Sequence, residues 1–100
     1  MRAKIKYAVF VKDDINEAVS WYNQNQKGLG ASFLKNEKEK INFIAQNPES
    51  IQLRYENVQM AVVKTFPYTI HFQYFKQENT LLILGVFHTS LSPDNWIKRL

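Results

Sequence analysis

The spacing of the apolar residues changes near residue 50, and this change limits the possible folds more than any other feature. Between Ile15 and Ala45, apolar residues recur every three or four positions, which is the period of a helix packed on one face. From Ile51 onward they alternate with polar residues, which is the period of a strand. The 100 residues suffice for one domain with a sizeable core. We therefore expect a single α+β domain spanning residues 1–100.

The helical part should follow a short first strand. Alternation up to Val11 predicts that strand, and Asp13 or Asp14 is expected to cap the first helix. The inward stripe of this helix has helical spacing and consists of Ile15, Ala18, Val19 and Tyr22. Lys27–Gly30 should end the first helix, and Asn47-Pro48 should end the second, because a residue before proline is pushed out of helical geometry. The short link between them predicts an αα-hairpin.

The second helix is expected to have one apolar and one charged side. Its inward residues are predicted to be Phe33, Leu34, Ile41, Ile44 and Ala45. The charged run 35–40 should face solvent. Gly28 and Gly30 are interpreted as turn residues. Large aromatic residues are usually buried, so we expect a core position for Trp21, Tyr22, Phe33, Phe66 and Trp96.

The two-residue period predicts four further strands. They are expected around residues 51–55, 60–65, 69–75 and 81–88. Asn57 and residues 76–79 should form turns, and Pro67 should separate the second and third of these strands. The almost wholly apolar run 81–87 predicts a central strand covered on one face by the helices. The predicted fold is an N-terminal strand and an αα-hairpin packed on a C-terminal antiparallel sheet of three to four strands.

Charge and composition exclude several classes of function. The formal charge is +4, and each half of the chain carries an excess of only two cations, so no concentrated basic block indicates a dedicated nucleic-acid binder. There is no cysteine, and His71 and His88 are far apart, so we expect no metal and no cofactor. No apolar run approaches the about 18 residues of a membrane span. We expect a cytoplasmic protein that binds neither a membrane nor a small-molecule substrate.

Five short motifs occur in order along the chain. They are Glu17-Ala18 with Trp21-Tyr22, Gly28-Leu29-Gly30 with Phe33, Asn47-Pro48, Lys64 with Phe66-Pro67-Tyr68, and Phe87-His88-Thr89-Ser90. Their order and spacing resemble the RelE/ParE toxin superfamily, on the ParE side. The resemblance implies a RelE/ParE-like fold and the role of toxin in a type II toxin–antitoxin module. It also implies a cognate antitoxin, whose C-terminal segment folds onto the toxin's exposed apolar and basic surface.

ParE-like toxins are understood to poison DNA gyrase by protein–protein contact, so the resemblance implies a binding toxin rather than an enzyme. Two departures from the family pattern favour this interpretation. Where the family commonly has arginine and aspartate after its final motif, this chain has Leu91 and Ser92, and residues 59–63 lack the arginines often found there. Candidate target-binding residues lie on strand ends or in the C-terminal segment: Arg54, Tyr55, Lys64, Tyr68, His88, Leu91 and Trp96.

The alternative is a ribosome-dependent mRNA endoribonuclease of RelE type. Without a metal, side chains must move the 2′-hydroxyl proton and offset the phosphate charge. The candidates are His88 as acid/base, Arg54 and Lys64 as phosphate clamps, and Tyr74 or Tyr68 as a base-stacking residue, with His71 as the second imidazole. A third possibility is a non-toxic antitoxin-binding module that lost its potency through Leu91 and Ser92.

Overall fold

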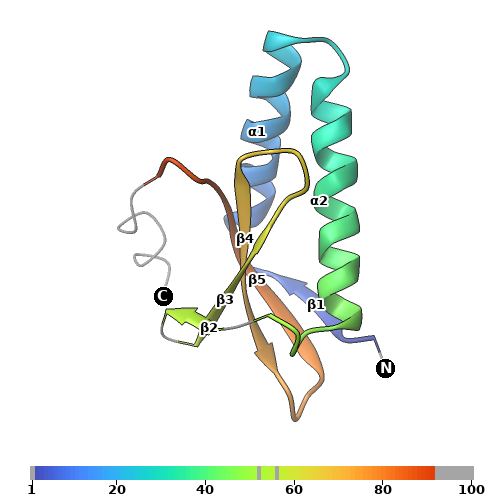
Figure 1. The fold of residues 1–100 in the computed structure, drawn as a ribbon, viewed down its shortest axis with the longest axis vertical. Coiled ribbons are helices and arrows are strands. Elements are labelled where there is room, and N and C mark those ends of the chain that lie inside the picture. Colours follow the sequence, from blue (N-terminus) through green and yellow to red (C-terminus); the bar gives the residue numbers. More distant parts are fainter. Residues whose placement is uncertain (1, 52, 56, 92–100) are drawn as a thin grey trace.

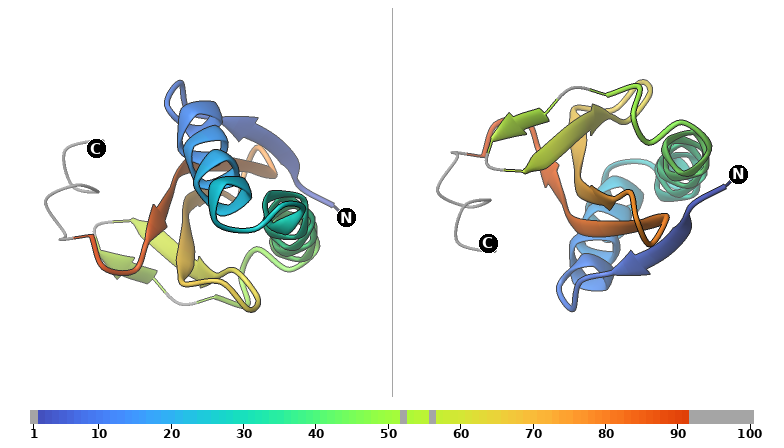
Figure 2. Two further views of the ribbon diagram at one scale, coloured as in Figure 1. Left: turned by 90° about the horizontal axis from the view of Figure 1, so that it is seen from above. Right: turned by 90° about the horizontal axis from the view of Figure 1, so that it is seen from below.

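The computed structural model describes residues 2–51, 53–55 and 57–91 and confirms the α+β fold. The elements are β1 (Lys4–Tyr7), α1 (Val11–Asn25), α2 (Leu29–Gln46), β2 (Leu53–Tyr55), β3 (Val58–Val62), β4 (Tyr68–Phe75) and β5 (Thr80–His88). The two helices form a hairpin that packs along one face of the sheet (Figures 1 and 2). The five strands form one sheet in the order β1-β5-β4-β3-β2.

The sheet is mixed rather than purely antiparallel. Strands β2 to β5 pair antiparallel in chain order, as predicted, and β1 adds a parallel strand beside β5. Strand β5 therefore lies in the sheet interior, which agrees with its apolar sequence, whereas β1 forms one edge. Parallel pairing needs a long crossover, and the helical hairpin lies within the segment that joins β1 to β5.

One cluster of buried side chains lies between the helices and the sheet. Its largest fully buried members come from α2 and the two central strands: Phe33, Ile44, Ile70, Phe72, Leu81 and Ile83. The stripe predicted for α1 also faces this core, with Ala18 and Tyr22 buried and Ile15 and Val19 partly buried. Burying a large apolar side chain contributes about 1.5–3 kcal/mol, so this cluster supplies the main driving force for the fold.

The ladder between β4 and β5 contains one irregularity that decides which side chains face the helices. His71 pairs with Gly85 but Phe72 pairs with Ile83, so Leu84 is an extra residue on β5. Before this bulge Leu81 and Ile83 face the core, and after it Val86 does. Simple alternation would turn His88 away from the helices; the bulge places it on their side.

The two glycines between the helices have different roles. Gly28 has a φ of +89°, a left-handed conformation that favours glycine and starts α2. Gly30 lies inside α2 and is buried, so the predicted turn role is wrong for this residue. A Cβ at Gly30 would lie 2.6 Å from the Val19 carbonyl oxygen and 2.7 Å from the Asn23 amide. Gly30 therefore permits the close approach of the two helices.

The predicted start of the helical part is wrong. Strand β1 ends at Tyr7, and Val11 already belongs to α1. The residue before α1 is Phe10, which has no side-chain capping bond, so neither Asp13 nor Asp14 caps the helix. The Asp14 carboxylate accepts a hydrogen bond from the backbone of β5 instead. The Asp14 carboxylate thus bonds to the distant strand β5 instead of to the first turn of its own helix.

Strand and burial predictions need three further corrections. The strand expected at 60–65 is β3 and ends at Val62, because Thr65 adopts a left-handed turn with φ of +66°. Trp21 is 56% exposed rather than in the core, whereas Tyr22 and Phe33 are buried and Phe66 packs against the core. Glu37, in the run expected to face solvent, is only 2% exposed. Trp96 lies outside the described residues.

Candidate target-binding site

A cleft of about 490 Å³ lies between α1 and the ends of β4 and β5. We call it the α1 cleft and define it by Asp14, Glu17 and Trp21 of α1, Tyr68 of β4, Val86, Phe87 and His88 of β5, and Ser90 and Leu91 after it. Trp21 and Leu91 are exposed, at 56% and 40%. Exposed apolar side chains around a concave site are typical of surfaces that bind another molecule.

Asp14 fixes the inner wall of the α1 cleft. Strand β1 ends opposite Ile83, so beyond this point no strand among the described residues pairs with that side of β5. The Val86 N–H donates to Asp14 Oδ2 at 3.1 Å, which satisfies the amide and ties α1 to β5. This bond sets the width of the cleft, because it holds its two walls at a fixed separation.

His88 is held in one orientation at the edge of the cleft. The Ser90 N–H donates to His88 Nδ1 at 3.0 Å, and Ser90 Oγ lies 2.7 Å from the same nitrogen. Because Nδ1 accepts the backbone bond, the neutral imidazole carries its proton on Nε2. The His88 ring meets the Tyr68 ring edge-on at 5.2 Å. The histidine can therefore present a fixed N–H donor to a bound partner.

Tyr68 belongs to an aromatic cluster that explains several of the sequence motifs. Its ring contacts Tyr22 at 6.0 Å and Phe33 at 4.9 Å, and Phe66 contacts the same two rings at 4.9 and 5.3 Å. Burial raises the pKa of Tyr68, and Tyr22 and Glu17 raise it further. Its hydroxyl therefore stays protonated and can donate a hydrogen bond. Tyr22, Phe33 and Phe66 thus support the ring of Tyr68, which lines the α1 cleft.

The charge of the α1 cleft is acidic. Asp14 and Glu17 line it, whereas no Lys or Arg among the described residues does. A phosphate group placed here would meet two carboxylates, with no lysine or arginine of the described residues to compensate its charge. Cleavage of RNA needs the opposite arrangement, with cations placed against the developing negative charge. The cleft suits a partner surface with apolar and cationic groups.

The structure brings together only some of the predicted site residues. Tyr68, His88 and Leu91 meet in the α1 cleft. Lys64 is exposed on the β3–β4 turn and does not line the cleft; its carbonyl accepts a bond from Asn36 of α2 at 3.2 Å. Arg54 and Tyr55 lie on edge strand β2, three strands from β5 and thus about 14 Å away. Ser92 and Trp96 lie outside the described residues.

The residues predicted for a nuclease do not form one site. In the ladder, His88 pairs with Tyr68 and Leu81 pairs with Tyr74, so Tyr74 lies six residues along β4, about 20 Å from His88. His71 is fully buried, its ring 4.8 Å from that of Phe87 and its Nε2 2.9 Å from Thr69 Oγ1. Neither Tyr74 nor His71 can act on a substrate held at His88.

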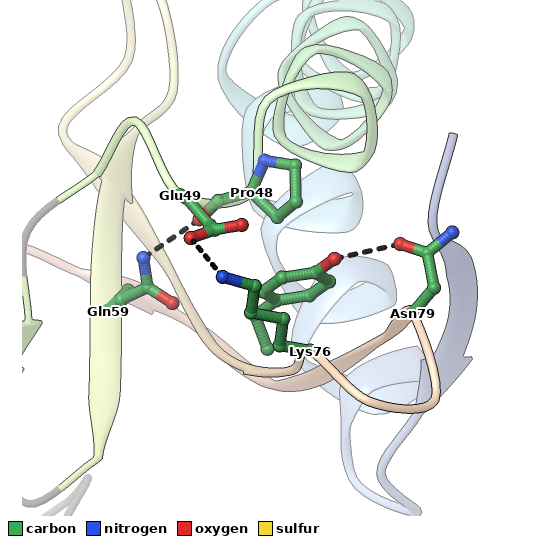
Figure 3. Close-up of polar contacts among 6 residues, drawn as sticks. Pro48, Glu49, Gln59, Lys76 and Asn79 are labelled. Carbon is green, nitrogen blue, oxygen red and sulfur yellow. Dashed lines mark hydrogen bonds and ion pairs between the residues drawn. The ribbon is translucent and has the colours of Figure 1, made fainter. Parts of the chain in front are cut away.

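A second hollow, of about 550 Å³, surrounds Tyr74 at the opposite end of β4. Its polar groups bond to one another: the Tyr74 hydroxyl donates to Asn79 Oδ1 at 2.8 Å, and Lys76 pairs with Glu49 at 3.6 Å. Figure 3 shows this network, with Gln59 donating to the Pro48 carbonyl at 3.0 Å. These mutual bonds join the C-terminal end of α2 to the sheet, so we interpret this region as structural.

Three residues that line the α1 cleft from helix α1 were not predicted as site residues. Asp14, Glu17 and Trp21 recur at i, i+3 and i+7, which places them on one face of α1 beside its apolar stripe. The prediction that Asp14 caps the helix and that Trp21 is buried concealed this pattern. A polar and aromatic row beside a core stripe is the signal that could have revealed the cleft.

Comparisons with known proteins rest on structure alone. No family model matches the sequence, and no curated protein matches it either. The ParDE toxin–antitoxin system of P. aeruginosa contains a chain with a TM-score of 0.76 and 12% identity, over 89% of this chain and 98% of that one. This chain has the fold of the RelE/ParE toxins. That finding confirms the fold that the five sequence motifs implied.

Two further structures share the fold. A mutant of the E. coli toxin RelE in the free state has a TM-score of 0.66 and 15% identity, over 100% of this chain and 99% of that one. The RelBE2 toxin–antitoxin complex of Mycobacterium tuberculosis has a TM-score of 0.61 and 14% identity, over 88% and 92%. Both ParDE and RelE proteins thus share the fold, so the fold does not choose between a ParE-like and a RelE-like activity.

Two other properties of the described residues bear on function. Neither of the two described helices has an apolar stretch of the length that a membrane span requires. Within residues 2–51, 53–55 and 57–91, no three histidine, aspartate or glutamate side chains are grouped so that they could hold a metal ion.

Proposed function

We propose that this chain is the toxin of a type II toxin–antitoxin module and that it acts by binding a cellular protein through the α1 cleft. The observation that supports this most is the composition of the cleft, in which exposed Trp21 and Leu91 flank two carboxylates and a fixed histidine. Aromatic anchors around a concave site with a polar rim are the features of a protein-binding hot spot.

DNA gyrase is the target suggested by the resemblance to ParE toxins. In this proposal Trp21, Tyr68 and Leu91 supply apolar contact area, and Glu17 and His88 supply polar contacts. Asp14 is a positioning residue, because its carboxylate already holds the Val86 amide. Gyrase and ribosomes are both cytoplasmic, so we expect the chain to act in the cytoplasm.

The second candidate function is ribosome-dependent cleavage of mRNA. One observation favours it: His88 lies at the cleft edge with Nδ1 bonded to Ser90, which leaves Nε2 as the group that could exchange a proton. The acidic cleft and the distance between His88 and Tyr74 count against it. The nuclease therefore depends on His88 alone, with no cation from the described residues beside it in the cleft.

The partner proposed for either activity is an antitoxin. The similar chains from P. aeruginosa and M. tuberculosis come from a toxin–antitoxin system and a toxin–antitoxin complex. We expect the protein encoded just upstream to form a stable complex with this chain and to block its activity. Size-exclusion chromatography of the two purified proteins at micromolar concentration tests this. Two separate elution peaks would contradict the toxin–antitoxin function.

A further inference from the structure

A third concave site lies on the other side of α1 and shares no residue with the α1 cleft. This hollow, of about 370 Å³, is formed where the end of β1, the first turns of α1 and the middle of α2 meet. We call it the Glu37 pocket; it is lined by Tyr7, Ala8, Val11, Lys12, Ile15, Leu34, Glu37 and Lys38. Most of these side chains are apolar. The hollow between them is not filled by core side chains and is not part of the proposed target-binding site.

Glu37 is the unusual residue of this pocket. It is 2% exposed, and its Oε1 has no hydrogen-bond partner among the residues that the structure describes. Burial raises the pKa of its carboxyl group to about 7, against the opposing effect of Lys38. A buried oxygen without a partner costs about 1–3 kcal/mol, and native proteins rarely retain one. The Glu37 pocket therefore has room for a hydrogen-bond donor that a bound partner could supply.

The surface around the pocket mouth has a defined chemistry. Tyr7, Val9 and Phe10 are 55%, 80% and 54% exposed, which makes the β1–α1 connection an apolar patch. Lys12 and Lys38 line the pocket itself, and Lys4 and Lys6 are exposed on neighbouring β1. An apolar hollow bordered by lysines complements an acidic segment with a large apolar residue.

The same lysines argue against a second copy of this chain as the occupant. The formal charge of the chain is +4, and a symmetric contact through this surface would bring the lysines of both copies together. Like charges across an interface oppose association. A partner of opposite charge removes this conflict.

We propose that the Glu37 pocket receives an acidic segment of the antitoxin, with one large apolar side chain in the hollow and one N–H donor bonded to Glu37 Oε1. This inference rests on the proposed toxin–antitoxin function and adds the site, the charge and the anchor chemistry of the antitoxin segment. The segment in the Glu37 pocket is an anchor distinct from whatever part of the antitoxin covers the α1 cleft, since the two sites have no lining residue in common.

The test compares Glu37→Leu with Glu39→Leu, a matched change of an exposed glutamate on the same helix. Calorimetric titration with the protein encoded just upstream measures the affinity, and thermal unfolding measures the stability of the free chain. We expect Glu37→Leu to raise the melting temperature, because it removes the unsatisfied oxygen, and to weaken the antitoxin at least about tenfold. Glu39→Leu should change the affinity less than about twofold.

A gain in the stability of the free chain together with a loss of antitoxin affinity distinguishes a binding role of Glu37 from a structural one. A purely structural glutamate would change the stability of the free chain without weakening the complex. Unchanged affinity in Glu37→Leu would therefore overturn the pocket proposal while leaving the toxin–antitoxin function intact. No complex with the wild-type chain would overturn the function and the pocket together.

A charge-reversal variant gives a second, independent test. Lys12→Glu/Lys38→Glu should weaken the antitoxin at least about tenfold, with a loss that shrinks in high salt, because both lysines line the pocket. Equal affinity of this variant and the wild type would overturn the acidic character assigned to the segment.

Discussion

Helix α1 has a hollow on each side, and each hollow contains a carboxyl group. The two carboxyl groups differ in whether their oxygen atoms have a hydrogen-bond partner among the described residues. In the α1 cleft, Asp14 holds the Val86 amide and the wall is fixed. In the Glu37 pocket, one carboxyl oxygen of Glu37 has no partner within the described part of the chain, and burial raises the pKa of this carboxyl group to about 7. The satisfied carboxylate fixes a wall of the proposed target-binding site, whereas the unsatisfied one lowers the stability of the free chain, which the proposed antitoxin contact would restore. Helix α1 thus lies between the α1 cleft, whose wall is fixed by a hydrogen bond, and the Glu37 pocket, in which a hydrogen-bond acceptor is unsatisfied.

The largest expected effect is the pH dependence of stability that comes from Glu37. Its pKa is about 7 when folded and 4.5 ordinarily, so the folded chain retains the proton between these values. Retention of this proton stabilises the folded chain by about 3 kcal/mol. This contribution to the free energy of unfolding is complete below about pH 4.5 and is lost as the pH rises through 7. Tyr7 of β1, Lys12 of α1 and Lys38 of α2 are the charged or titratable groups that line the same pocket.

Urea unfolding of the wild type and Glu37→Gln checks this prediction. The amide cannot ionise, so the difference in unfolding free energy between the two proteins should change by about 3 kcal/mol between about pH 4.5 and 8.5. A difference that stays constant with pH would show that Glu37 is not buried in an apolar environment.

The next effect lies on the other side of α1. Asp14→Ala should destabilise the chain by about 1–3 kcal/mol, because the Val86 amide loses its partner in a partly buried position. The neighbouring Asp13 is exposed, so Asp13→Ala should change the free energy by less than about 0.5 kcal/mol. Equal urea midpoints for the two variants would contradict a fixed wall in the α1 cleft.

A smaller effect on stability but a clear one on activity is expected at Trp21. Trp21→Ala should lower target inhibition at least about tenfold while costing about 1 kcal/mol of stability or less, since the side chain is largely exposed. Phe43→Ala is the control, because Phe43 is a comparably exposed aromatic residue on α2, at 49%, outside both hollows. Dose–response curves of growth inhibition compare the two variants. An equal loss of inhibition in both would mean that the α1 cleft is not the target-binding site.

The sequence predicts the features that depend on neighbouring residues, and it does not predict those that depend on contacts between elements far apart in the chain. The helical hairpin and strands β4 and β5 follow from local periodicity, and Pro67 separates β3 from β4 as expected. The cleft does not, because it depends on the bulge at Leu84, which turns His88 toward α1. A bulge changes the side-chain register without any change in local composition.

The errors at Asp14 and Glu37 have the same origin. Both residues have local roles available, as a helix cap and as a member of a charged helical run, and both are used in tertiary contacts instead. Trp21 shows the reverse case, in which an aromatic residue expected in the core lies on the surface. Local patterns specified the elements, and the packing of those elements decided the chemistry of the sites.

The smallest change is expected from restoring the two residues that depart from the family pattern. If the chain is an active toxin, Leu91→Arg/Ser92→Asp should give no gain in growth inhibition. Leu91 already lines the α1 cleft as an apolar contact. A gain of toxicity in this variant would support the view that the chain is a degenerate antitoxin-binding module.

The most direct test of the central claim is a paired assay of the purified chain and Trp21→Ala. One arm measures inhibition of gyrase supercoiling and cleaved plasmid, and the other measures mRNA cleavage on translating ribosomes. We predict gyrase poisoning by the wild type, loss of at least about tenfold in Trp21→Ala, and intact mRNA. Ribosome-dependent cuts that disappear in His88→Ala, without gyrase poisoning, would contradict the claim that the α1 cleft is a protein-binding site.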